Sequence, residues 1–142
     1  MRRTKIAAVW VMAVVTLCFA CGAWAQEDPR PIAAKAAKVW LALIDNGQYG
    51  ASWETAAVYF KTTITKEYWQ QSISAIRKPL GRLVSRELRA GTYTRSLPGA
   101  PDGEYVVFQF LSSFENKKTA IERVIPMLDK DGIWRVSGYY LE

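Results

Sequence analysis

The chain has 142 residues, a formal net charge of +6, two cysteines and no histidine. Without histidine it lacks the usual general base of a Ser-His-Asp triad and the commonest side-chain ligand of zinc, so those catalytic and metal-binding classes are excluded. Hydrophobic residues make up 50% of the sequence and charged residues 23%, which is typical of a folded domain and not of a disordered chain.

The first 25 residues have the three parts of an export signal. Arg2, Arg3 and Lys5 precede an apolar run over residues 6–19, and the sequence Ala-Trp-Ala at positions 23–25 places small residues where a signal peptidase recognises its substrate. We therefore predict a signal peptide over residues 1–25, cleaved after Ala25, and export to the periplasm or out of the cell.

Two other interpretations of this segment stay open from the sequence. One is an uncleaved anchor, because residues 6–25 are about as long as a membrane-spanning helix. The other is a lipoprotein acylated at Cys21, although Cys18 and Phe19 stand where a lipobox has a branched apolar and a small residue. Cleavage would remove Cys18 and Cys21 together, so their C-x-x-C spacing predicts no redox or metal site in the exported chain.

Cleavage also changes the charge and length that remain. Three basic residues and no acidic ones are removed, so the net charge falls from +6 to +3 over 117 residues. The remaining basic residues form no dense stripe, and we expect no nucleic-acid-binding surface. A chain of this length can bury about two thirds of its surface in one core. We predict a mobile lead-in over residues 26–32, a single domain over residues 33–142, and no membrane span after cleavage.

The part of the domain before Pro79 has helical spacing of its apolar residues. A first helix is predicted over residues 33–44, because apolar residues recur there every three or four positions and Asn46-Gly47 provides a stop. A second, short helix is predicted over residues 49–61. Thr65 is expected to cap a third helix that ends at Pro79.

From Arg82 onwards the apolar residues alternate with period two. Strands are predicted over residues 83–97, 105–114, 119–128 and 133–142, with a bulge at Gly91 and an edge, bulge or strand end at Pro126. Short turns join these strands, so they form an antiparallel meander. We predict an α+β fold in which N-terminal helices pack on a curved four-stranded antiparallel sheet, cone-like as in the nuclear-transport-factor-2 and cystatin folds.

Four motifs of the sequence point to a known family. They are WLALIDNGQYGASWETAA at 40–57, IRKPLG with VSREL at 76–88, LPGAPDGEYVVFQF at 97–110 and DGIWRVSGYYL at 131–141. With these four motifs in this order, the chain resembles the domain-of-unknown-function family numbered 4019, which consists of small bacterial proteins often exported behind a signal peptide. The resemblance implies an exported, single-domain protein, and it implies no activity, cofactor or catalytic residue.

Five residues are candidates for lining a ligand pocket inside the cone. Alternation allows Arg86 of the first strand and Glu122 of the third to point inward and form an ion pair, with Arg77 near the same mouth. A buried arginine suits a carboxylate or phosphate ligand, but such a pair can equally be structural. Trp53 and Tyr140 are aromatic candidates, and an ordinary core would explain their spacing as well.

The loop sequence LPGAPDG has two interpretations, as does the later DKDG sequence. Exposed amides around Gly99 and Gly103 would suit an anion, whereas turn chemistry alone explains each residue, and we favour a rigid hairpin connection. The DKDG sequence at 129–132 lacks the later acidic ligands of a calcium loop, so we predict a turn and no metal site.

These observations favour a non-catalytic exported module that binds a small molecule or an envelope protein, with a homodimer through an exposed sheet face as a further expectation. No cofactor and no catalytic residue are assigned. The alternative is an isomerase, dehydratase or hydrolase that uses a pocket carboxylate, either Glu122 with Tyr140 or Asp45. An inward Glu122 without an arginine partner would favour this chemistry, whereas pairing with Arg86 would favour a structural role or anion binding.

Overall fold

The structure is a computed structural model that describes residues 26–142. The predicted signal peptide, with Cys18 and Cys21, lies outside these residues. The elements follow one another in the order α1 (Arg30–Asp45), α2 (Tyr49–Glu54), α3 (Val58–Thr63), α4 (Lys66–Arg77), a single 3-10 turn (Lys78–Leu80), β1 (Leu83–Thr94), β2 (Tyr105–Phe114), β3 (Lys117–Leu128) and β4 (Trp134–Leu141).

The first helix starts earlier than the sequence predicted. It begins at Arg30 and has a proline in its first turn, where a missing N–H costs no hydrogen bond, so residues 30–32 belong to α1 and not to the lead-in. Its end is as predicted, with Gly47 at φ 72° and the Gln48 amide donating to the Leu43 carbonyl at 2.8 Å. The helix buries one stripe, formed by Ala33, Ala37, Trp40, Leu41 and Ile44.

The second predicted helix is in fact two short helices, α2 and α3. Ala57 lies between them in an extended conformation, and its amide donates to the Val136 carbonyl of β4 at 2.8 Å. In a continuous helix this amide would donate to a carbonyl of the same helix. The break between α2 and α3 instead lets it donate to the edge strand β4.

The third predicted helix corresponds to α4. The Thr65 hydroxyl accepts a hydrogen bond from the Tyr68 amide at 3.3 Å, and Glu67 lies in the first turn. Trp69 and Ile73 are buried on its inner face, and Arg77 joins them there.

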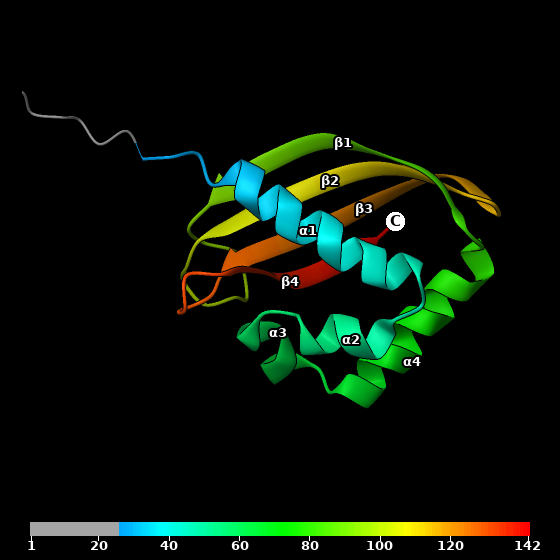
Figure 1. Ribbon diagram of the computed structural model, residues 1–142, viewed down its shortest axis with the longest axis horizontal. Helices are drawn as coiled ribbons and strands as arrows, with labels where there is room; N and C mark the ends of the chain where they lie inside the picture. Colours follow the sequence, from blue (N-terminus) through cyan, green and yellow to red (C-terminus); the bar gives the residue numbers. More distant parts are fainter. Residues whose placement is uncertain (1–25) are drawn as a thin grey trace, which may run out of the picture.

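The four strands form one antiparallel sheet in the order β1-β2-β3-β4, which confirms the predicted α+β class. The sheet is curved, and α1 crosses its concave face while α2, α3 and α4 lie below the β4 edge (Figure 1). A bulge lies between Leu88 and Ala90, so its extra residue is Arg89, two positions before the predicted Gly91. A Cβ atom at Gly91 would lie 2.7 Å from the Phe108 ring, so this close packing requires the glycine.

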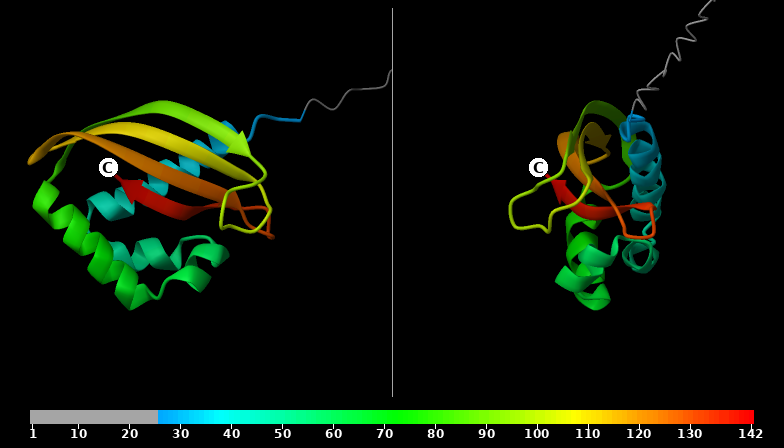
Figure 2. Two further views of the ribbon diagram at one scale, coloured as in Figure 1. Left: turned by 180° about the vertical axis from the view of Figure 1, so that it is seen from behind. Right: turned by 90° about the vertical axis from the view of Figure 1, so that its left-hand side faces the viewer.

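The main core lies between α1 and the concave face. Side chains of β2, β3 and β4 that alternate inward meet the apolar stripe of α1, and they are Val106, Phe108, Phe110, Val124 and Val136. The convex face carries no helix in the described part of the chain (Figure 2). None of the helices between residues 26 and 142 is both long and apolar enough to cross a membrane.

Candidate functional site

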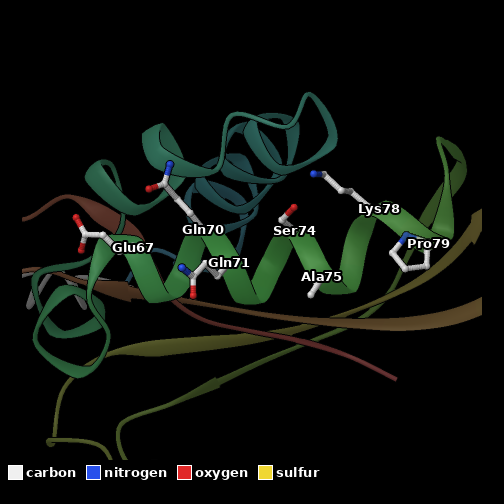
Figure 3. Close-up of a pocket in the computed structure, with 7 residues that line it drawn as sticks. All are labelled: Glu67, Gln70, Gln71, Ser74, Ala75, Lys78 and Pro79. Carbon is white, nitrogen blue, oxygen red and sulfur yellow. The ribbon is translucent and has the colours of Figure 1, made fainter.

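A shallow hollow of about 680 Å³ runs along the outer side of α4 (Figure 3). Its lining comes entirely from this helix and the turn that follows it. A single helix face has no opposing wall, so this hollow cannot enclose a ligand. Its residues are Glu67, Gln70, Gln71, Ser74, Ala75, Lys78 and Pro79.

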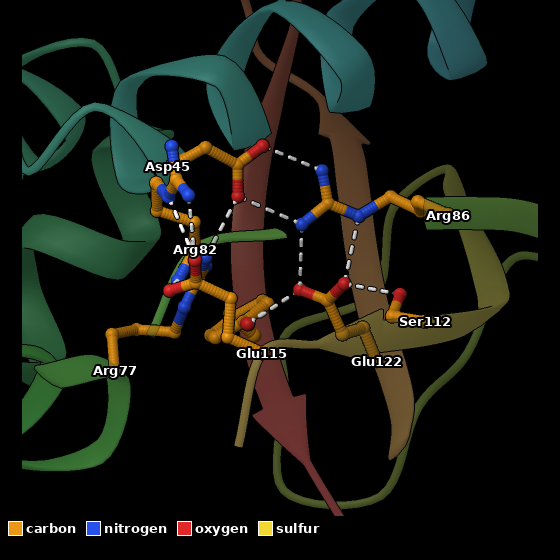
Figure 4. Close-up of polar contacts among 8 residues, drawn as sticks. Asp45, Arg77, Arg82, Arg86, Ser112, Glu115 and Glu122 are labelled. Carbon is orange, nitrogen blue, oxygen red and sulfur yellow. Dashed lines mark hydrogen bonds and ion pairs between the residues drawn. The ribbon is translucent and has the colours of Figure 1, made fainter. Parts of the chain in front are cut away.

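Arg86 and Glu122 meet inside the cone (Figure 4). Arg86 of β1 stands opposite Ser112 of β2, and Glu122 of β3 stands opposite Phe110, so alternation brings both side chains to the concave face. Arg86 Nε donates to Glu122 Oε1 at 2.7 Å and Nη2 donates to Oε2 at 3.0 Å. This two-pronged geometry is the strongest form of an arginine–carboxylate pair.

Asp45, the last residue of α1, connects this pair to α4. Its two oxygens accept hydrogen bonds from Arg86 at 2.7 and 2.9 Å, and Oδ1 also accepts one from Arg77 Nη2 at 2.8 Å. Arg77 is only 5% exposed, and its guanidinium carbon lies 4.8 Å from the centre of the Phe114 ring. The predicted candidates Arg77, Arg86 and Glu122 are therefore joined through a residue that the sequence had suggested only as a separate carboxylate.

Glu122 is completely buried, and its two oxygens accept four hydrogen bonds. Besides the two from Arg86, the Ser112 hydroxyl and the Tyr139 hydroxyl donate, the latter at 2.6 Å. A buried carboxylate is stable only when its lone pairs are used in this way. We call this group the charged cluster; its members are Asp45, Arg77, Arg86, Ser112, Glu122 and Tyr139.

The surroundings of Asp45 and Tyr139 in the charged cluster shift the pKa values of both groups. Burial alone would raise the pKa of Asp45, but the hydrogen bonds from Arg86 and Arg77 outweigh it and lower that pKa below its ordinary value. Burial, together with the negative charge of Glu122, raises the pKa of Tyr139 far above its ordinary value. At neutral pH Asp45 is thus ionised and Tyr139 neutral, and neither has a pKa near 7 that would suit proton transfer.

Tyr140 does not reach this cluster. Its side chain is 57% exposed, and the residue stands opposite Arg123 on the convex face. The cause is a bulge, because Ile125 and Pro126 pair with Gly138 and Val136 and leave Ser137 without a partner. One extra residue reverses the faces of the remaining strand, so Tyr139, and not the predicted candidate Tyr140, takes the inward position.

Trp53 also lies away from the cluster. Its ring is half-buried against the main core, and its Nε1 donates to the Ile64 carbonyl at 2.9 Å. The Lys61 ammonium lies 5.9 Å from the ring centre. These contacts tie α2 to the chain after α3, so the observed role of Trp53 is packing.

A larger hollow, of about 1240 Å³, lies at the other end of the sheet. It opens where α3, the loop over residues 95–104 and the β3–β4 turn meet, and we call it the loop-end hollow. Its lining contains apolar and charged residues; we call the apolar residues Val58, Met127 and Leu128 the floor and the charged residues the rim. The lining consists of Val58, Tyr59, Thr62, Arg95, Ser96, Pro101, Asp102, Gly103, Glu104, Met127, Leu128, Asp129, Lys130, Asp131 and Arg135.

The LPGAPDG segment forms one wall of this hollow. Gly99 adopts φ 75°, and its carbonyl accepts a hydrogen bond from the Tyr59 hydroxyl at 2.9 Å. The Tyr105 hydroxyl donates to the Pro101 carbonyl at 2.6 Å, and Tyr105 itself is buried in a second small core beneath the loop. The segment is thus a rigid turn, as we favoured, and it also shapes a hollow that the sequence did not predict.

No cluster of three Cys, Asp or Glu side chains that could hold a metal is present among residues 26–142. The sequence comparisons add a family and no activity. A family profile described as "Protein of unknown function (DUF4019)" matches residues 36–139. No curated protein and no solved structure matches the chain. The likeness to the nuclear-transport-factor-2 and cystatin folds therefore stays a prediction.

Proposed function

The chain belongs to the DUF4019 family, whose description assigns no activity, and we propose its role from its own geometry. The protein is an exported, non-catalytic binding module that takes a small molecule or an envelope protein as its partner. Export rests on the cleaved signal peptide predicted over residues 1–25. The proposed location is the periplasm or the outside of the cell.

The pairing of both carboxylates of the charged cluster with arginine is the observation that carries this proposal. Glu122 accepts hydrogen bonds from Arg86, Ser112 and Tyr139, and Asp45 accepts them from both arginines. A general base needs a free lone pair directed at a substrate and a pKa close to the working pH. The four hydrogen bonds to Glu122 occupy its lone pairs, and Asp45 accepts three hydrogen bonds from two arginines that hold its pKa below the ordinary value. Both observations weigh against an isomerase, dehydratase or hydrolase at this place.

The convex sheet face is where a second copy of the chain would bind. Its central positions on β2 and β3, Val107, Leu111, Ile121 and Ile125, are apolar and only half-buried. The homodimer stays a prediction, and a species of twice the chain mass in the measurement described next would support it.

Native mass spectrometry of the full chain, expressed with its own N-terminus and purified from a periplasm without refolding, tests the proposed role. We expect a chain that begins at Gln26 and carries a non-covalent partner, either a small molecule or a protein, that dissociates on activation. A chain that retains residues 1–25, with or without lipid on Cys21, would contradict export by cleavage. Turnover of a substrate that is abolished by Glu122→Gln in a folded protein would contradict the non-catalytic role.

A further inference from the structure

The walls of the loop-end hollow are fixed by contacts within the protein. Arg135 donates to Asp129 at 2.9 Å and to the two oxygens of Asp131 at 2.9 and 2.8 Å, which holds the β3–β4 turn. On the opposite wall, Glu104 accepts a hydrogen bond from the Tyr93 hydroxyl at 2.8 Å. A site whose walls are already ordered loses little conformational entropy when a ligand binds.

The floor of the hollow is a small apolar surface. Met127 is 8% exposed and belongs to the second small core, while Leu128 beside it is half-buried. Val58, at the start of α3, is 61% exposed although it is a large aliphatic residue. These three side chains offer apolar contact area to one large apolar side chain of a ligand.

The rim carries charges of both signs, and some of them form no ion pair within the described part of the chain. Arg135 is occupied by its two aspartates, whereas Asp102 and Lys130 form no ion pair with any residue between 26 and 142. The lining contains four acidic and three basic residues, so the hollow has no excess of positive charge for a polyanion. A ligand that matches this rim carries charges of both signs itself.

We propose that the loop-end hollow binds a peptide segment of a partner protein that presents one large apolar side chain between a basic and an acidic residue. The inference rests on the proposed binding role and names the class of its ligand. The volume of about 1240 Å³ exceeds the roughly 300–1000 Å³ of a typical small-molecule pocket, and the hollow is open to solvent, as a bound peptide requires. The apolar side chain would lie on Val58, Met127 and Leu128, with the flanking charges near Asp102 and Lys130.

The test uses an end-blocked synthetic peptide of sequence Ser-Lys-Phe-Glu-Ser, titrated to millimolar concentration into isotope-labelled protein of residues 26–142 purified from the periplasm. Amide NMR shifts report the contact site. We expect shifts confined to residues 58–62, 95–104 and 127–135. The same peptide with serine in place of phenylalanine should lose most of the effect.

A matched pair of variants sharpens the test. Val58→Ser should weaken binding of the peptide about fivefold, since it removes apolar contact area from the floor. Val39→Ser is the control, because Val39 is 62% exposed on α1, well away from the hollow, and its replacement should leave binding unchanged. Both positions are solvent-exposed, so neither change should unfold the protein.

Three results would overturn the inference. Absence of shifts, or shifts that map to α4 or to the convex sheet face, would show that this hollow takes no such peptide. Equal binding of the phenylalanine and serine peptides would show that the apolar floor does not contribute to peptide binding. A small molecule seen at the hollow in the purified protein would replace the peptide as ligand while leaving the binding role intact, so failure of this inference is distinguishable from failure of the proposed function.

Discussion

The two ends of the sheet contain the same kinds of side chain and use them differently. In the charged cluster, two arginines, two carboxylates, a serine and a tyrosine are buried or half-buried and bonded to one another. At the loop-end hollow, arginine, lysine, aspartate and glutamate surround an open apolar floor. Within the charged cluster, Arg77 Nε and Nη1 have no hydrogen-bond partner among residues 26–142, but both atoms are buried. The difference teaches that inward charge, even with unused bonding capacity, indicates a binding site only where it lies next to accessible space.

Location explains why the first end is closed. The cluster joins the end of α1, the end of α4 and strands β1, β2, β3 and β4, so it fixes how the helices lie on the sheet. Its two positive and two negative charges cancel. Such an arrangement adds little net stability over apolar packing, but removing one member leaves buried charge uncompensated.

The largest expected effect comes from Arg86→Ala. This change removes the shared partner of Asp45 and of the completely buried Glu122, and we expect the free energy of unfolding to fall by about 3–5 kcal/mol. Urea denaturation followed by tryptophan fluorescence measures it. Arg82→Ala is the matched control, because the Arg82 side chain is 88% exposed and pairs with Glu115 at the surface, where such pairs are worth about 0–1 kcal/mol. Equal losses in both variants would contradict a structural role for the cluster.

Tyr139→Phe should have a smaller effect. It removes one donor to the buried Glu122, and a loss of about 1–2 kcal/mol in the free energy of unfolding is expected. The neighbouring Tyr140→Phe changes an exposed hydroxyl on the convex face, so its effect should stay within about 0.5 kcal/mol. If Tyr140→Phe proved the more costly of the two, the position of the β4 bulge would be wrong.

The smallest effect concerns pH and Asp45. Because the pKa of Asp45 is lower in the folded chain than its ordinary 3.8, ionised Asp45 stabilises the fold above that pH. This contribution is lost as the pH falls below about 4, when the unfolded chain takes up the proton first. The stability difference between the wild-type protein and Asp45→Asn should therefore shrink between pH 7 and pH 3. A difference that is constant across this range would show that the charge of Asp45 does not matter to the fold.

The order of helices and strands could be predicted because the period of the apolar residues changes once, near Pro79. The meeting of Arg86 and Glu122 followed from alternation along β1 and β3, which holds at both positions. The participation of Ser112 could also have been predicted, since it is the one polar residue in the inward row of Phe108, Phe110 and Phe114.

Tyr139 and the loop-end hollow could not be predicted in the same way. Choosing Tyr139 over Tyr140 requires the bulge opposite Pro126, and the sequence indicates an irregularity at this proline without fixing on which strand the extra residue lies. The hollow is formed by three segments far apart in the chain. Its shape depends on how the 95–104 loop packs on α3, where the Tyr59 hydroxyl donates to the Gly99 carbonyl, which is a tertiary contact that no local pattern encodes.

Peptide binding to the Glu122→Gln variant tests the contrast between the two ends most directly. The titration is done without urea, where the amide NMR spectrum shows whether the variant is folded. In the folded variant the Ser-Lys-Phe-Glu-Ser peptide should produce the same shifts and bind with the same affinity as in the wild-type protein. The variant should nevertheless unfold at a lower urea concentration than the wild-type protein. Loss of binding in Glu122→Gln with binding retained in Val58→Ser would contradict the account, because it would place the ligand in the charged cluster and not in the loop-end hollow.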